Sequence, residues 1–156
     1  MRRFVIIFIL LFPLSSLLAQ NTNGVTALCV SQAGKTLAEL ILPENGEFIL
    51  TYTHSIHKRP VYEYYRAESG MLHLYELRYD TTSTGMPSDS EGGFRIENGF
   101  FVLTMNRWFI MLPIFISPIP GHGVIINERL YPFTTWAQEE TAIELSCNSV
   151  THKGFP

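Results

Sequence analysis

Residues 48–66 read Phe-Ile-Leu-Thr-Tyr-Thr-His-Ser-Ile-His-Lys-Arg-Pro-Val-Tyr-Glu-Tyr-Tyr-Arg, and the rest of the chain can be interpreted outward from them. They form two runs rich in β-branched and aromatic residues, joined by a short basic corner. Such runs, bounded by a turn, predict two antiparallel strands of one sheet. They also hold the densest mixture of aromatic and polar residues in the sequence, so a functional site is expected here.

The alternation of side chains along a strand places Tyr52 and His54 on one face and Ser55 on the other. A serine nucleophile needs a base within hydrogen-bond reach, so this spacing argues against a local pair of Ser55 and His54. A four-residue loop at 57–60 places His54 opposite Glu63 on the next strand. This pairing predicts that His54 and Glu63 are in contact.

A third strand-like run, residues 71–79, follows Ser69-Gly70, a dipeptide typical of a two-residue hairpin turn. That turn places Glu63 opposite Glu76, with Arg78 as a diagonal neighbour. Facing carboxylates repel, so they need a cation, a metal or a shared proton between them. We therefore expect a ladder of His54, Glu63 and Glu76, although a register shift of one residue would send Glu76 to the other face.

The first residues have the form of an export signal, because Met1-Arg2-Arg3 precedes an apolar run at 4–12. The run is too short to span a membrane comfortably, and Ala19 is a suitable last residue of a removed peptide. We predict a signal peptide at 1–19 and one all-β domain at 20–156 with no membrane span, located in the periplasm or cell envelope. An uncleaved N-terminal membrane anchor is the alternative.

Removal of Arg2 and Arg3 leaves nine Lys plus Arg (11 minus 2) against 14 Asp plus Glu, a net charge of −5 with His neutral. This acidic balance is unlike that of nucleic-acid-binding domains, which need a clustered basic surface, so nucleic acid is excluded as a partner. Cys29 and Cys147 are the only cysteines. Because they lie in the first and last expected strands, which we expect to be neighbours, we predict a disulfide between them, with two buried thiols as the alternative.

The remaining sequence consists of short β-type segments with turn residues between them and no long helical period. We predict a single small β-sandwich or partly open β-barrel of roughly eight to ten antiparallel strands. A short helix over 37–42 is an alternative for one segment. The expected strands beyond the central three lie at 25–30, 36–42, 94–97, 100–105, 109–117, 124–127 and 142–147.

Residues 80–93 form a polar loop that contains Gly85-Met86-Pro87 and is long for a hairpin connection. This tripeptide, together with the pattern Tyr-x-His-Ser-Ile-x-x-x-Pro-Val-x-Glu-x-Tyr at 52–65, resembles the domain of unknown function 1850 family. The resemblance extends over about residues 46–133. The family consists of small exported bacterial proteins with no established activity, often encoded beside TRAP transporters of the TAXI type. The family positions carried over by the resemblance are His54, Ser55, Glu63, Gly85, Met86, Pro87 and His122.

Two functions are compatible with these residues, and a purely structural network of His54 with the glutamates is the alternative to both. The first is a non-enzymatic module that binds a small solute or a TAXI-type TRAP transporter component through the face of His54, Glu63 and Glu76 and the loop at 85–87. The second is a metal-dependent or acid-base enzyme that uses His54 and Glu63. The histidines form no recognised metal-ligand motif, so no metal or other cofactor is expected.

Overall fold

A computed structural model describes residues 24–81 and 92–151 and confirms the all-β class. In this part of the chain, no helix is long and apolar enough to cross a membrane. The expected signal peptide at 1–19 and the loop residues Gly85, Met86 and Pro87 lie outside the described residues. The elements are β1 (Gly24–Gln32), β2 (Lys35–Ile41), β3 (Glu47–Thr53), β4 (Pro60–Glu68), β5 (Met71–Tyr79), β6 (Phe94–Glu97), β7 (Phe100–Phe109), β8 (Leu112–Phe115), β9 (Gly123–Ile126), β10 (Arg129–Pro132), the 3₁₀ turn η1 (Phe133–Thr135) and β11 (Ala142–Thr151).

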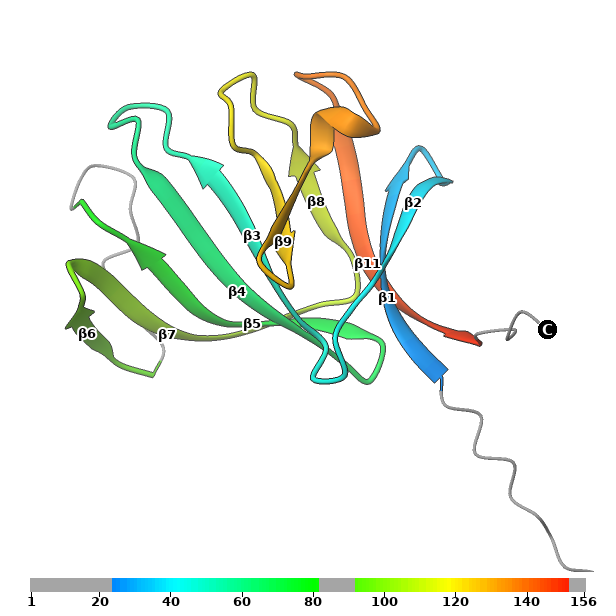
Figure 1. The fold of residues 1–156 in the computed structure, drawn as a ribbon, viewed down its shortest axis with the longest axis horizontal. Helices are drawn as coiled ribbons and strands as arrows, with labels where there is room; N and C mark the ends of the chain where they lie inside the picture. Colours follow the sequence, from blue (N-terminus) through cyan, green and yellow to red (C-terminus); the bar gives the residue numbers. More distant parts are fainter. Residues whose placement is uncertain (1–23, 82–91, 152–156) are drawn as a thin grey trace, which may run out of the picture.

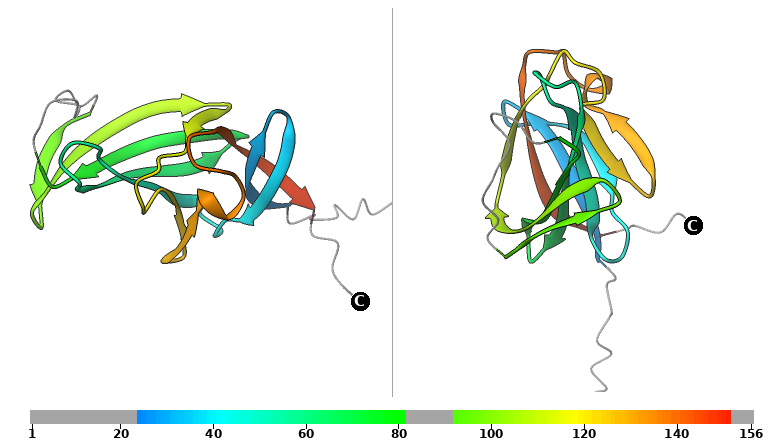
Figure 2. Two further views of the ribbon diagram at one scale, coloured as in Figure 1. Left: turned by 90° about the horizontal axis from the view of Figure 1, so that it is seen from above. Right: turned by 90° about the vertical axis from the view of Figure 1, so that its left-hand side faces the viewer.

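The strands form two antiparallel sheets that pack as a sandwich rather than a closed barrel (Figure 1). One sheet has four strands in the order β2-β1-β11-β8, and the other has seven in the order β10-β9-β3-β4-β5-β7-β6. The left-hand view of Figure 2 shows that the larger sheet is strongly twisted and that its β6–β7 end lies far from β1 and β2. The smaller sheet therefore covers only part of the larger one.

Short turns fix much of the pairing within the larger sheet. Ser69 and Gly70 have φ values of 51° and 77°, the left-handed conformations of a type I′ hairpin turn. This turn pairs Glu68 with Met71, as predicted. The bounds of β5 and β6 are also those predicted from the sequence.

A β-bulge in the middle of β5 changes which side chains face the core. The register between β4 and β5 shifts between the pairs Tyr65–Leu74 and Tyr64–Glu76, so Tyr75 is the extra residue. Leu74 is buried before the bulge and Leu77 after it, so the inward side chains change from even to odd positions. Glu76 consequently points away from the core.

Three further expectations about the elements are corrected. The chain runs through Asn106-Arg107 as part of β7, where a break was expected, and it turns instead at 110–111. Strand β10 was not predicted, and eleven strands are present in the described ranges instead of eight to ten. Residues 37–41 belong to strand β2, so the alternative of a short helix is wrong.

The first and last strands are neighbours, as expected, but the predicted disulfide is wrong. Strands β1 and β11 pair antiparallel, with Leu28 opposite Cys147 and Cys29 opposite Ser146. Because successive side chains alternate between faces, Cys29 and Cys147 point to opposite sides of the sheet. Both are buried free thiols, which was the alternative reading.

Candidate functional site

The loop between β3 and β4 is longer than the sequence suggested, and it changes the partner of Glu63. Strand β3 ends at Thr53, which pairs with Pro60, so six residues connect the strands. Leu50 rather than His54 lies opposite Glu63. His54 opens the loop, where its backbone N–H donates to the Arg59 carbonyl at 2.8 Å. The expected direct pairing of His54 with Glu63 is therefore wrong, and Glu63 instead shares the inward face of Leu50.

Two tyrosine hydroxyls hold the Glu63 carboxyl group. Tyr65 donates a hydrogen bond to Oε2 at 2.9 Å, and Tyr52 donates one to Oε1 at 3.3 Å. Burial raises the pKa of Glu63 above its ordinary value, while these two bonds and the charge of Arg107 act in the opposite direction. Burial and the neighbouring carboxylate also raise the pKa of both tyrosines. The hydroxyls thus remain neutral donors at all physiological pH values.

Glu76 and Arg78 belong to a different surface, because the bulge at Tyr75 turns them to the outer face of the sheet. Arg78 Nε donates to Glu76 Oε1 at 2.6 Å, and Arg95 Nη2 donates to Oε2 at 2.7 Å. Arg78 was expected as a cation between Glu63 and Glu76, but it forms its ion pair with Glu76 on the outer face. The predicted ladder from His54 through Glu63 to Glu76 is therefore absent.

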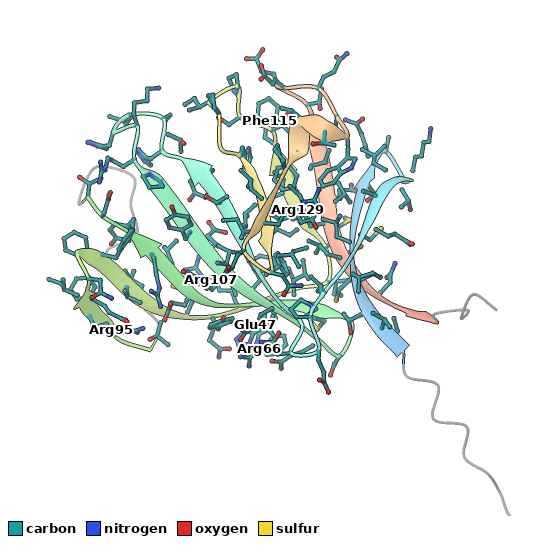
Figure 3. The ribbon with its side chains drawn as sticks, in the orientation of Figure 1. Glu47, Arg66, Arg95, Arg107, Phe115 and Arg129 are labelled. Atoms are coloured by element: carbon teal, nitrogen blue, oxygen red, sulfur yellow. The ribbon has the colours of Figure 1, made fainter. Side chains whose placement is uncertain are left out.

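Further along the same outer face, Arg66 Nη2 donates to Glu47 Oε1 at 2.6 Å, and the two side chains are seen together at the lower edge of the sheet in Figure 3. The guanidinium of Arg66 also lies 5.1 Å from the centre of the Tyr75 ring. These pairs are partly exposed, so each contributes little to stability. The outer face is a network of charges and aromatic rings that is separate from Glu63.

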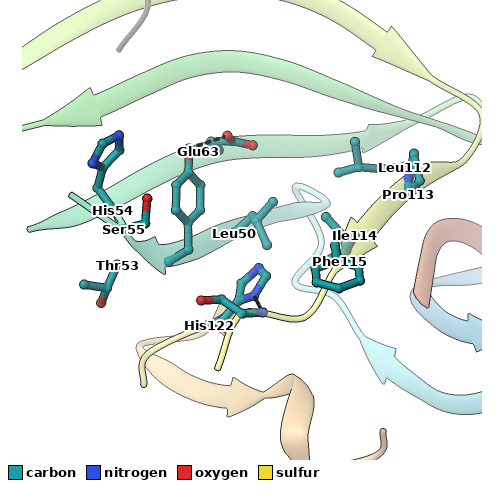
Figure 4. A pocket seen from close by; sticks show the side chains of 12 residues that line it. Leu50, Thr53, His54, Ser55, Glu63, Leu112, Pro113, Ile114, Phe115 and His122 are labelled. Carbon is teal, nitrogen blue, oxygen red and sulfur yellow. Dashed lines mark hydrogen bonds between the residues drawn. The ribbon is translucent and has the colours of Figure 1, made fainter. Parts of the chain in front are cut away.

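A cavity of about 460 Å³ lies between β3 and β4 of the larger sheet and β8 of the smaller one. Figure 4 shows Glu63, His54 and Ser55 on one side and the β8 residues on the other. His54 and Ser55 both line it, since regular alternation ends at Thr53, before them. The lining residues are Leu50, Tyr52, Thr53, His54, Ser55, Glu63, Leu112, Pro113, Ile114, Phe115, Ser117 and His122.

His122 comes from the connection between β8 and β9 and contributes a second polar group to the cavity. Its Nδ1 accepts a hydrogen bond from the Ser117 backbone N–H at 2.9 Å, so the neutral ring carries its proton on Nε2. The ring packs edge-on against Phe133, with centroids 5.0 Å apart, and against Tyr52 at 6.1 Å. Burial lowers the pKa of His122, which favours this neutral form.

The cavity brings together four of the predicted site residues, His54, Ser55, Glu63 and His122. Two contributions were not predicted from the sequence. Tyr65 was not singled out as a site residue, although the signal was available, because residues two apart on a strand share a face and Tyr65 follows Glu63 by two. The wall formed by β8 had no local signal at all, because that strand reaches the cavity through its pairing with β11.

Chemically, the site presents a partly buried carboxyl group, a neutral imidazole and an apolar wall around one cavity that is open to solvent. No group of three His, Cys, Asp or Glu side chains within 24–81 and 92–151 is arranged to hold a metal ion. A mainly apolar cavity with a few convergent polar groups is typical of a small-ligand site.

The fold and this site define an all-β, sandwich-like domain with a cavity between its sheets that contains a carboxyl group and an imidazole. The chain belongs to the family described as "Domain of unknown function (DUF1850)", whose family model matches residues 48–133. The match confirms the resemblance stated above and includes every residue that lines the cavity. Comparison with curated proteins and with solved structures found no match.

Proposed function

We propose that this protein is a non-enzymatic binding module that holds a small solute in the cavity between β3, β4 and β8. The observation that carries the proposal is the Glu63 carboxyl group, which is partly buried, fixed by Tyr52 and Tyr65, and lines the cavity. Burial of a carboxyl group costs stability unless all its hydrogen bonds are made. Because Glu63 keeps this unfavourable position beside a cavity, its placement supports a role in binding.

The hydrogen-bonding positions that remain on Glu63 and His122 indicate which kind of solute the cavity would bind. A carboxylate has about four acceptor positions, and the two tyrosines use two of them. The remaining positions suit an ammonium or another N–H donor. The Nε2–H of His122 suits an acceptor, and side chains such as Leu50 and Ile114 suit an apolar portion. The expected solute is amphipathic, with a cationic or N–H-bearing end.

We further propose that the module is exported and assists TRAP transport of the TAXI type. The basic and then apolar residues at 1–19 support export, and the family resemblance supports the transport association. Mass spectrometry of the protein from its native envelope should find an N-terminus near Gln20. An intact Met1 in that preparation would instead support the N-terminal membrane anchor.

An acid-base enzyme is the second candidate, because the raised pKa of Glu63 is a property that catalytic carboxyl groups share. The two candidates differ in what happens to the solute. Binding leaves the solute chemically unchanged after prolonged incubation, whereas catalysis yields a product at a rate that falls when Glu63 is replaced. Mass spectrometry of the recovered solute decides between them.

The binding test is calorimetry at pH 8.5 with n-butylammonium, its carboxylate analogue butyrate, and neutral butanol. We expect measurable binding of the ammonium compound and at least about tenfold weaker binding by Glu63→Gln, since hydrogen bonds to charged groups contribute about 1.5–3 kcal/mol. Glu39→Gln is the matched control, because Glu39 is exposed on β2 and the charge change is the same. Equal affinities of the two variants would exclude Glu63 as the ligand-binding group.

A further inference from the structure

Strand β8 is the last strand of the four-stranded sheet, and no other described strand pairs with its outer edge. Four consecutive residues of β8, 112–115, line the cavity. Side chains of consecutive strand residues point to opposite faces, so one face of β8 cannot supply all four. The strand therefore presents its free backbone edge to the cavity.

Hydrogen bonds at the end of β8 show which backbone groups lie on that edge. The Ile116 N–H donates to Thr141, on the side of β11, at 2.9 Å, and the Ser117 N–H donates to His122 in the cavity. Backbone groups of alternate residues point to the same edge. Phe115 and Pro113 therefore direct their backbone groups the same way as Ser117, toward the cavity.

The free edge thus offers a short set of backbone hydrogen-bonding groups. Phe115 supplies one N–H and one C=O, while Pro113 supplies only a C=O because proline has no N–H. The Phe115 side chain is 65% exposed and lies at the upper end of the strand in Figure 3. An extended chain that pairs with Phe115 would add a strand to this sheet, the mode of recognition known as β-augmentation.

We propose that the solute of this site is a short extended peptide, whose backbone pairs with Phe115 on β8 and whose ammonium group reaches Glu63. The edge recognises the peptide backbone, and the carboxylate across the same cavity complements a positive charge. The ammonium is either the peptide's amino terminus or a lysine side chain. A cavity of about 460 Å³ admits a segment of a few residues, because ligand sites of about 300–1,000 Å³ enclose molecules of that size. This inference rests on the proposed binding function.

The test uses calorimetry at pH 8.5 with four probes. Two peptides, acetyl-Ala-Lys-Ala-methylamide and Ala-Ala-Ala-methylamide with a free amino terminus, distinguish the two sources of ammonium. The third probe is the tighter-binding of these two peptides with its backbone nitrogens methylated, so that it cannot donate backbone hydrogen bonds, and n-butylammonium carries the charge alone. We expect one of the first two peptides to bind at least about tenfold more tightly than n-butylammonium, and backbone methylation to remove that advantage.

The protein side of the test is Phe115→Pro, which removes the backbone N–H at the free edge. Proline is tolerated on edge strands, so the fold should persist. Phe115→Ala is the control, because it keeps the N–H and changes only an exposed side chain. We expect Phe115→Pro to lower the ratio of peptide affinity to n-butylammonium affinity about tenfold relative to Phe115→Ala.

The outcomes separate the two proposals. Peptides that bind no more tightly than n-butylammonium, or that bind Phe115→Pro and Phe115→Ala equally well, overturn the peptide inference while the binding function stands. Failure of all four probes to bind overturns both proposals. If Phe115→Pro does not fold, the comparison of the tighter-binding peptide with its methylated form decides the inference.

Discussion

Tyr65→Phe tests the account of how Glu63 is held. The substitution removes one hydroxyl group and keeps the ring, which is 1% exposed and stacks on Phe48 with centroids 5.3 Å apart. Its effect should therefore come from the lost 2.9 Å hydrogen bond to Glu63 and not from a change of packing. Glu63 then retains only the longer bond from Tyr52, at 3.3 Å.

The size of the effect should depend on pH. A hydrogen bond to a charged group contributes about 1.5–3 kcal/mol and one between neutral groups about 1 kcal/mol. Folding raises the pKa of Glu63 above 4.5, so the wild-type protein should lose stability as pH rises from 4.5 through the folded pKa. Without the Tyr65 bond the folded pKa rises further, and the variant should lose more. The cost of Tyr65→Phe should therefore grow from about 1 kcal/mol at pH 4.5 to about 1.5–3 kcal/mol at pH 8.5.

The assay is urea unfolding at both pH values, followed by circular dichroism, for the wild type, Tyr65→Phe, Glu63→Gln and the double variant. In the Glu63→Gln background the cost should stay near 1 kcal/mol at either pH. Tyr62→Phe on the same strand is the control, since its half-buried ring packs edge-on against Phe100 on the other face. A cost of Tyr65→Phe that is independent of both pH and Glu63 would refute the reasoning.

Two other predictions concern the framework. Because Cys29 and Cys147 are free thiols, the denatured chain should react with two equivalents of Ellman's reagent without prior reduction, and a reductant should not change the melting temperature. An absence of reactive thiols would contradict this. Gly46 has φ +70°, and an added Cβ would lie 2.7 Å from the Ala67 carbonyl oxygen, whereas Gly70 has φ +77° and open space. In urea unfolding, Gly46→Ala should cost at least about 1 kcal/mol more than Gly70→Ala; equal costs would argue against the close approach.

Features set by neighbouring residues were predicted well from the sequence. The period of two within strands predicted the all-β class, and the turn chemistry of Ser69-Gly70 fixed the first pairs of β4 with β5. The sequence also places Glu63 on the same face as Tyr52, which the structure confirms, because a register error of an even number of residues leaves the face unchanged. These properties need only the local backbone conformation.

The composition of the site was predicted less well. The six-residue loop after Thr53 moved His54 away from Glu63, and loop length depends on how both strands pack. The bulge at Tyr75 sent Glu76 to the outer face. The sequence did contain a signal for it, since leucines at 72 and 74 are followed by one at 77, a spacing that a regular strand does not bury on one face.

By itself, then, the sequence determined most of the strands, their tight turns and the shared face of Tyr52 and Glu63. The tertiary structure alone decided what Glu63 faces. Its cavity needs β8, which is placed by pairing with β11 about thirty residues further along the chain. The face of Cys147 relative to Cys29 likewise follows from the register of β1 with β11. Such long-range registers are selected by burial of the whole core, and no local pattern of residues specifies them.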